Sequence, residues 1–407
     1  MEDKIETAVC AVGERLLGWL TAVALPLWWD RGVDRISEGY FERLQTDATP
    51  IHEVRRCRVQ SRQIYAFSVG SDLGWSGDAG AAIRTGLSFL TRAYTHPDGT
   101  LGMTASDDGM ALDPTISIYN QAFGLLAMAQ AHRCFPQEDH VFRARALRDH
   151  LRARYSHPLG GFEESSPPSL PLKSNPHMHM LEACLAWVEL DDVRVDSGWR
   201  DLADTIAGLA LGRLIDPQTG YLREYFAHDW TPMPGEEGRV VEPGHQFEWA
   251  WLLARWGLLR ERADAVQAAR KLAYLGEAHG VCRERNLCYG ALRDDHTVLD
   301  AVARLWPQTE RLKAGFLLSQ IARSTDERQF WLERVLFAAR GLEGFLQTPV
   351  NGLWWDKCLA DGHFVVEPAP ASTLYHIVCA LMVLHEPWSE SGAVQSIPSP
   401  ASVERIQ

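Results

Sequence analysis

Long apolar stretches dominate this chain, and in six places their helical periodicity is interrupted by polar residues that a buried helix usually avoids. Each interruption comes about 16 to 25 residues after a glycine. These glycines recur with steps of 60, 61, 60, 70 and 62 residues, at Gly39, Gly99, Gly160, Gly220, Gly290 and Gly352. The spacing predicts one supersecondary unit repeated six times.

Each unit has the length of two ordinary helices joined by loops. In three of the turns a proline precedes the glycine by two or three residues, which fixes φ at one position and permits a positive φ at the other, in HPDGTLG, HPLGGF and DPQTGYL. Six hairpins bury their faces best when the array closes, because an open array leaves two apolar ends exposed. We therefore predict an all-α fold, an α/α six-hairpin barrel with six inner and six outer helices.

The barrel should occupy residues 1–388 as a single catalytic domain, since no internal segment has the composition of a linker. Residues 389–407 carry the Ser, Pro and Gly bias of a flexible tail. Near the N-terminus, the apolar stretch 16–29 follows acidic residues and is too short to span a bilayer. We expect it to form the first helix of the array.

The net charge of −13 argues against nucleic acid and against anionic membranes, because both need a basic surface. An acidic chain fits a neutral small molecule better. Eight scattered cysteines without a C-x-x-C pair predict buried thiols in a reducing cytoplasm and give no support for structural zinc. We expect a cytoplasmic monomer or homodimer that uses no cofactor.

The six polar interruptions fall at the same phase of the repeat. If the helices after the turns form the inner ring, their polar residues converge on one end of the barrel, where a closed array is expected to have its pocket. The residues concerned are Arg62, Tyr119, Asn120, Asn175, His177, His179, Glu182, His245, Glu248, Trp306, Glu310 and His376.

Two of these segments share the pattern H-x-x-E, in His179 with Glu182 and in His245 with Glu248. Residues three apart lie on one helix face, so each carboxylate can orient its neighbouring imidazole. One such pair arises easily by chance, and glutamate near a helix N-terminus is favoured by the dipole alone. Because the H-x-x-E pair recurs in consecutive repeats, we favour a functional role for both pairs. His376 falls at the same phase of the repeat, so we also favour a functional role for it over that of a core histidine.

Arg62 lies between polar residues and an apolar run, so its guanidinium should be enclosed and should need an anionic partner. That partner is either a substrate or a carboxylate of the chain itself. Flat aromatic faces suit sugar rings, although most tryptophans belong to the core. We expect Trp306 and one of Trp354 and Trp355 to form walls of the pocket.

Three histidines from separate helices lack the short spacing of the usual metal sites. Imidazole suits proton transfer near neutral pH, and an enclosed arginine can stabilise the oxyanion that forms as the proton leaves. Together these groups describe proton abstraction next to a carbonyl through an enediolate.

The segments NPHMHMLEA and PGHQFEWAWLL, the arginine of SRQIYAF and the late His376 resemble the N-acylglucosamine 2-epimerase superfamily over residues 10–385. The resemblance implies the same barrel, opening of a sugar ring, and a histidine acid/base pair without a metal. It implies that His376 takes the C2 proton, that His245 assists ring opening and returns the proton, and that Arg62 stabilises the enediolate. The positions that would bind sugar hydroxyls or orient the histidines are Tyr119, Asn175, His179, Arg239, Glu248 and Trp306.

The same family includes isomerases, which return the proton to C1, and 2-epimerases, which return it to C2. The sequences NPHMHMLEA and SRQIYAF resemble those of the mannose isomerase branch, so we expect interconversion of D-mannose and D-fructose. A 2-epimerase of the N-acylglucosamine, mannose or cellobiose type stays open. A glycoside hydrolase with Glu248 and Glu310 would leave the histidines unexplained, and a pure binding protein finds no heptad run to support an interface.

Overall fold

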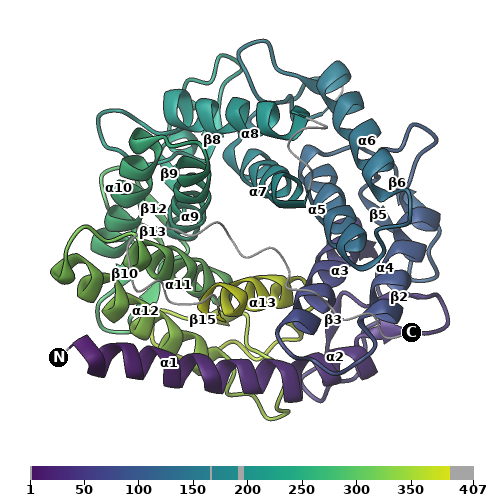
Figure 1. Ribbon diagram of the computed structural model, residues 1–407, viewed down its shortest axis with the longest axis horizontal. Helices are drawn as coiled ribbons and strands as arrows, with labels where there is room; N and C mark the ends of the chain where they lie inside the picture. Colours follow the sequence, from purple (N-terminus) through teal and green to yellow (C-terminus); the bar gives the residue numbers. More distant parts are fainter. Residues whose placement is uncertain (1, 166, 191–196, 386–407) are drawn as a thin grey trace.

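The computed structural model describes residues 2–165, 167–190 and 197–385, and in this part of the chain the helices form two concentric rings (Figure 1). Each inner helix packs on the next, and the last packs on the first. The inner ring consists of α3 (Cys57–Asp72), α5 (Ile118–Cys134), α7 (Ser174–Leu190), α9 (Pro243–Leu259), α11 (Leu305–Gln320) and α13 (Ser372–His385). The predicted α/α six-hairpin barrel is confirmed.

The outer helices each pack against the inner ring or against one another. They are α4 (Ala79–Ala93), α6 (His140–Tyr155), α8 (Gly198–Leu209) with its continuation η2 (Ala210–Leu214), α10 (Ala263–His279), α12 (Thr325–Phe345), and the run α1 (Glu2–Trp19), η1 (Leu20–Ala24) and α2 (Leu25–Arg31).

The first outer run contains the stretch 16–29 that the sequence assigned to the first helix. Residues 4–31 are apolar and long enough to cross a membrane, by length and composition alone. In the barrel, α1 packs against α12 and α13 (Figure 1). Its apolar side is therefore used in the fold, where Leu16, Leu20 and Leu25 are at most 2% exposed.

The inner helices are apolar around most of their circumference because they lie between the outer ring and the residues on the barrel axis. In α9, for example, only Arg255, Leu258 and Leu259 are not buried. A polar side chain on such a helix must find a partner inside the protein or serve a ligand.

The recurrent glycines have two different physical causes. Gly99, Gly160 and Gly220 have φ values of 85°, 101° and 82°, the left-handed conformation expected where proline precedes glycine in a turn. Gly39 has no such conformation, but an added Cβ would lie 2.4 Å from the Phe89 ring. The repeat therefore marks both a turn and a close approach.

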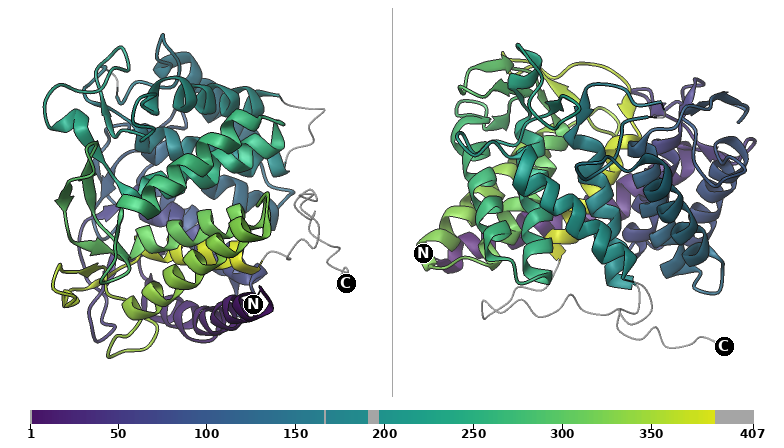
Figure 2. Two further views of the ribbon diagram at one scale, coloured as in Figure 1. Left: turned by 90° about the vertical axis from the view of Figure 1, so that its left-hand side faces the viewer. Right: turned by 90° about the horizontal axis from the view of Figure 1, so that it is seen from above.

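Short antiparallel strands join the loops at one end of the barrel (Figure 2). Each pair links loops of neighbouring repeats or closes a turn within one. The strands are β1 (Val33–Asp34), β2 (Gly39–Tyr40), β3 (Arg43–Leu44), β4 (Arg55–Arg56), β5 (Thr104–Ala105), β6 (Ala111–Asp113), β7 (Leu172–Lys173), β8 (Tyr225–Phe226), β9 (Val240–Val241), β10 (Val281–Cys282), β11 (Leu287–Cys288), β12 (Ala291–Arg293), β13 (Val298–Asp300), β14 (Ala303–Arg304), β15 (Lys357–Cys358) and β16 (Ala369–Pro370), with a 3-10 turn η3 (Glu237–Arg239) before β9.

The fourth residue of the inner helices ties these loops down. In α3, α5 and α9 this residue is a glutamine. Its side-chain oxygen accepts from the backbone N–H of one loop residue, and its NH2 group donates to the carbonyl of the same residue, as Gln60 does with Tyr40, both at 2.8 Å. Gln121 forms the same pair of bonds with Leu101, and Gln246 forms them with Leu222. In α7 the fourth residue is His177, which accepts from Phe162 N–H at 2.9 Å. His177, to which the family resemblance assigns no role, therefore holds a loop in place.

The seam of the barrel joins the first and last repeats. Strand β3 pairs with β16, and the side-chain amide of Gln63 donates to the carbonyl of Ala371 at 2.7 Å. Closure of this seam places α3 beside α13, which brings Arg62 next to the helix that carries His376.

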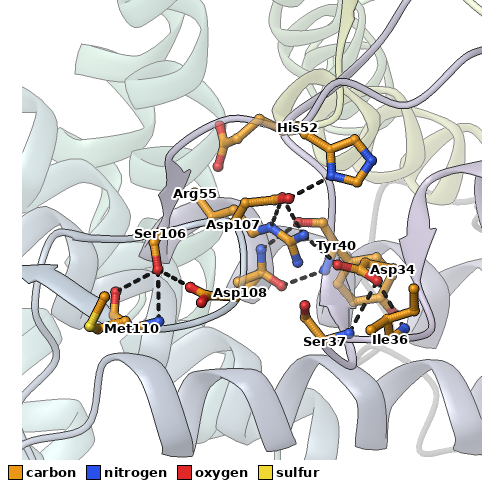
Figure 3. Close-up of polar contacts among 12 residues, drawn as sticks. Asp34, Ile36, Ser37, Tyr40, His52, Arg55, Ser106, Asp107, Asp108 and Met110 are labelled. Atoms are coloured by element: carbon orange, nitrogen blue, oxygen red, sulfur yellow. Dashed lines mark hydrogen bonds and ion pairs between the residues drawn. The ribbon is translucent and has the colours of Figure 1, made fainter.

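A charge cluster built around the buried pair Arg55 and Asp34, here called the rim cluster (Asp34, His52, Arg55 and Asp107), holds the loops in front of α3 (Figure 3). The Arg55 guanidinium lies 2.5 Å from Oδ2 of Asp34 and 2.5 Å from Oδ1 of Asp107. The other oxygen of Asp34 accepts two backbone N–H groups, and that of Asp107 lies 2.5 Å from His52. All eight cysteines are free thiols, and the predicted tail lies outside the described residues.

Candidate active site

The residues that carry chemistry lie at one recurrent position of the inner ring. Arg62, His179, Glu248 and Glu310 are each the sixth residue of their inner helix, and His376 is the fifth residue of α13. All five are at most 6% exposed. The closed repeat therefore brings together, near the barrel axis, residues that are far apart in the sequence.

His376 is held by a buried ion pair. Its Nδ1 atom lies 2.8 Å from Oε1 of Glu310, and Oε2 of Glu310 lies 2.6 Å from the Lys313 ammonium. Burial, together with the cations of Arg62 and Lys313, holds the pKa of His376 well below its usual value. The ring is therefore neutral, and because Nδ1–H donates to the carboxylate, Nε2 keeps its lone pair. His376 has the properties of a general base.

His245 is in the opposite protonation state. Its Nδ1 atom lies 2.9 Å from Oε2 of Glu224 and 3.6 Å from Oε2 of Glu242. Although burial alone would lower it, these two carboxylates raise the pKa of His245 to about 10. Glu224 is itself fixed by the Ser174 hydroxyl, which donates to it at 2.8 Å. His245 is a protonated imidazole that can donate a proton.

Trp306 connects the two histidines. Its ring centroid lies 5.2 Å from that of His245 and 5.6 Å from that of His376. The centroids of the two imidazoles are thus no further apart than the sum of these distances. A neutral base and a protonated acid flank one indole.

Arg62 is enclosed, as the sequence suggested. It donates to the Tyr119 hydroxyl at 2.8 Å and to the carbonyl of Ser372 at 3.3 Å, and its guanidinium lies 4.3 Å from the Phe123 ring centroid. No carboxylate in the described part of the chain forms an ion pair with it. Its charge is therefore available to an anion that develops on a ligand.

Tyr119, the hydrogen-bond partner of Arg62, also contacts His179, with 5.1 Å between the ring centroids, and two carboxylates lie beside His179. His179 Nδ1 lies 3.2 Å from Glu182 and 3.7 Å from Glu248, and the Tyr375 hydroxyl donates to Glu182. Burial lowers the pKa of His179 to about 4, so its ring is neutral and donates to Glu182. Both oxygens of Glu248 are buried without a hydrogen-bond partner, and burial and the nearby Glu310 raise its pKa well above the usual value.

The expected parallel between the two H-x-x-E pairs is half right. His179 does pair with Glu182 three residues on. His245 pairs with Glu224 and Glu242 instead of with Glu248, and Glu248 lies next to His179. The reason is that the loop before α9 supplies two carboxylates at the start of the helix, closer to His245 than its own helix face does.

Other predicted residues lie less centrally. Asn175 is half-buried at the start of α7, and its side-chain oxygen has no hydrogen-bond partner in the described residues. Arg239 is bound by Asp294 at 2.9 Å and by Asp295 at 2.6 Å. It remains 36% exposed, and no contact joins it to the histidines in the described part of the chain.

The expectation that Trp354 or Trp355 forms a wall of the site is wrong. Trp354 stacks on Trp28 with 4.7 Å between ring centroids and is 1% exposed. Trp355 donates to the backbone of Gln347 at 2.7 Å. Both fill the core between the first and last repeats.

Carboxylate and imidazole atoms approach one another within 4.8 Å in three axial groups, His179 with Glu182 and Glu248, Glu248 with Glu310 and His376, and Glu224 with Glu242 and His245. In each group the imidazole turns Nδ1 to a carboxylate, at 3.2, 2.8 and 2.9 Å. A nitrogen that donates its hydrogen cannot also ligate a cation. Nε2 of each ring stays able to bind a ligand or a cation, so chemistry without a metal stays a prediction.

Sequence reasoning missed Glu224, Lys313 and Tyr375. Glu224 follows the turn glycine of its repeat in a loop, where no periodicity distinguishes a carboxylate. Lys313 could have been found from its spacing, because it stands three residues after Glu310 and residues three apart lie on one helix face. The structure places Lys313 fully buried, at 0% exposure, which a lysine adopts only with a partner. Tyr375 reads as one more aromatic residue of an apolar helix.

This chain is similar to known proteins over most of its length. The model of the N-acylglucosamine 2-epimerase (GlcNAc 2-epimerase) family matches residues 39–380. A protein of Rhizobium meliloti (strain 1021) named mannose-6-phosphate isomerase is 48% identical over 374 residues, which cover 91% of this chain and 96% of the relative. Among solved structures, a cellobiose 2-epimerase from Bacillus thermoamylovorans B4167 has a TM-score of 0.81 at 17% identity, covering 91% of this chain and 98% of its own. A D-mannose isomerase has a TM-score of 0.80 at 18% identity, with 91% and 96% covered.

Proposed function

The chain belongs to the N-acylglucosamine 2-epimerase family, and from this membership and the site we propose that it interconverts D-mannose and D-fructose through a cis-enediolate. One observation carries the proposal above all. Two buried histidines, one neutral and one protonated, flank the same indole. Isomerisation can use such a pair, with one group removing the proton from C2 and the other supplying a proton to C1.

In the proposed reaction, the open-chain sugar lies with C1 and C2 between the two imidazoles. Nε2 of His376 removes the proton from C2, and the electrons form the C1–C2 double bond while negative charge develops on the carbonyl oxygen. The unpaired Arg62 guanidinium stabilises this oxyanion. The proton of the C2 hydroxyl passes to the oxygen on C1 while protonated His245 supplies a proton to C1, so that C2 becomes the carbonyl of the ketose. The same histidine assists ring opening beforehand.

The remaining predicted residues would hold the sugar. Tyr119 is positioned by Arg62, and Trp306 offers a flat face to the sugar carbons. Glu248 and Asn175 have buried oxygens without partners, which suits them to accept from sugar hydroxyls, and His179 would act beside Glu248. Arg239 would have to leave Asp294 and Asp295 to reach a sugar, so its role stays a prediction.

A 2-epimerase is the second candidate, because the matching family model is that of an epimerase and both outcomes use the same enediolate. Return of the proton to the opposite face of C2, in place of C1, would give the epimer. A phosphorylated hexose is an alternative substrate of the isomerase reaction, since the relative at 48% identity bears the name of a mannose-6-phosphate isomerase.

The reaction is tested by incubating the protein separately with mannose, mannose 6-phosphate, N-acetylglucosamine, cellobiose and an aryl glycoside. Fructose or its phosphate supports the proposal, and a C2 epimer supports the second candidate. Release of the aglycone from the glycoside would indicate hydrolysis. Binding without turnover of any sugar would contradict an enzymatic role.

We further propose that the enzyme works without a metal, in the cytoplasm, as a monomer or homodimer. Treatment with EDTA followed by gel filtration should leave turnover unchanged. Loss of activity that returns with a divalent cation would contradict this, and the three axial groups of carboxylates and imidazoles would then be the first sites to examine. The same gel filtration, calibrated for mass, distinguishes monomer from homodimer.

A further inference from the structure

An arginine outside the predicted site shares the helix face of Arg62. Arg58 lies four residues earlier on α3, in the first turn of that helix, and residues four apart in a helix are neighbours on its surface. Its guanidinium lies 5.8 Å from the Tyr119 ring centroid, and that of Arg62 lies 5.9 Å from the same centroid. Two guanidinium groups therefore flank one tyrosine.

Arg58 has no charge partner of its own among the described residues. Glu42, the carboxylate whose charge acts on Arg58, is engaged by Arg56, whose backbone N–H and Nε–H donate to its two oxygens, both at 2.6 Å. Burial, and then repulsion by the cations of Arg56 and Arg62, lower the pKa of Arg58. A half-buried guanidinium that is repelled by two others and paired with nothing is an unfavourable arrangement unless an anion joins it.

The spacing between Arg58 and Arg62 along α3 is comparable to the length of an open-chain sugar. Four helical residues rise by about 6 Å, a length comparable to the stretch of an open-chain hexose between C2 and C6. If Arg62 faces the oxyanion at C1 and C2, Arg58 lies where the far end of the same sugar would reach. Guanidinium binds phosphate through two parallel hydrogen bonds, which gives both strength and geometry.

We propose that Arg58 binds the phosphate of a hexose 6-phosphate and so makes the phosphorylated sugar the preferred substrate. This inference rests on the proposed isomerase function and specifies its substrate class.

The test compares kcat/KM for mannose and mannose 6-phosphate in the wild type and in Arg58→Gln. A charge-assisted hydrogen bond corresponds to roughly a 10- to 100-fold loss for the phosphorylated sugar, and the loss for mannose should be much smaller. Inorganic phosphate should inhibit the wild type competitively and the variant far less. Arg58→Lys should retain part of the preference. Arg340→Gln, on the exposed side of α12, is the matched control and should behave as the wild type.

An equal loss of kcat/KM for both sugars in Arg58→Gln would overturn the assignment, as would a wild type that converts mannose as well as its phosphate. In either case fructose formed from mannose would leave the isomerase proposal standing. If the wild type makes only 2-epimers, the isomerase proposal fails. The Arg58 assignment is then tested separately by calorimetry, in which mannose 6-phosphate should bind more weakly to Arg58→Gln than to the wild type. Equal affinity of the two proteins would contradict the assignment.

Discussion

Two charge clusters of this barrel differ in how completely their charges are matched. In the rim cluster, both oxygens of Asp34 and of Asp107 have partners, and Arg55 lies between them (Figure 3). At the barrel axis, both oxygens of Glu248 lack hydrogen-bond partners, and no described carboxylate pairs with Arg62. All four carboxylate oxygens of the rim cluster have partners, and only Nη1 of Arg55 is buried there without one, whereas at the axis both carboxylate oxygens of Glu248 lack partners among the described residues.

The difference separates two uses of the same residue types. Breaking a satisfied buried pair leaves a charge without compensation, so the rim should matter chiefly for stability. An unsatisfied buried group already costs stability, and it persists where a ligand completes its hydrogen bonds. Substitutions at the rim should therefore lower the free energy of unfolding, and substitutions at the axis should lower turnover.

The largest effect is expected for His376→Ala. Loss of the general base should lower kcat by roughly 10²- to 10⁴-fold, while the fold persists because Glu310 keeps its ion pair with Lys313. His385→Ala, at the exposed end of the same helix, is the matched control for kcat and melting temperature. Near-normal turnover of His376→Ala would remove this residue from the mechanism.

At the rim, Arg55→Met should have the largest effect on stability. It leaves Asp34 buried without its cation, which costs about 3–5 kcal/mol of the free energy of unfolding. The kcat of the folded protein should change far less than in His376→Ala. Urea unfolding measures the first quantity, with Arg340→Met as control. Unchanged stability together with abolished turnover would reverse the contrast between rim and axis.

Glu248→Gln and Asp34→Asn make the same chemical change in the two clusters. Because burial and Glu310 keep the pKa of Glu248 high, glutamine mimics its neutral form, and stability should stay equal or rise by about 1 kcal/mol. The value of kcat/KM should fall roughly tenfold through the lost interaction with the sugar. Asp34→Asn should instead lose about 1–3 kcal/mol of stability. Equal stability changes in the two variants would contradict the distinction.

The smallest effect is expected from pH in the neutral range. Activity needs neutral His376 and protonated His245, so kcat/KM should fall in acid as His376 gains a proton and again near pH 10 as His245 loses one. Although burial alone would raise it, the hydrogen bond from Arg55 lowers the pKa of Asp34. Its stabilisation is present above the unfolded pKa of about 3.9 and is lost as pH falls through the folded pKa. Both kcat/KM and melting temperature should therefore vary little between about pH 7 and pH 9. A steep change of activity in this range would contradict the assigned protonation states.

Much of the fold could be predicted from the sequence because its cause is periodic. The turn glycines mark the unit, and closure follows from apolar faces on both sides of the inner helices, as in α9. The rim cluster could not be predicted, since it depends on loops of two repeats meeting around Arg55. No local pattern distinguishes Asp34 from the other acidic residues of this chain.

The site was predictable where it follows the repeat and not where it depends on loops. Arg62, His179 and Glu248 share one helical position, so finding the period finds them. Glu224 decides the charge of His245, yet it comes from a loop. The stacking of Trp354 on Trp28 depends on which repeats meet at the seam. Because the chain contains many tryptophans, composition does not distinguish one that lines the site from one that fills the core.

The central claim is that two histidines in opposite protonation states transfer one proton each, and solvent exchange tests it most directly. Wild-type protein should convert its aldose in D2O to a ketose that carries deuterium at C1, because the group that returns the proton is not the one that removed it. Proton and carbon NMR of the product would show the label. A ketose that retains only the original C2 hydrogen at C1 would contradict this account.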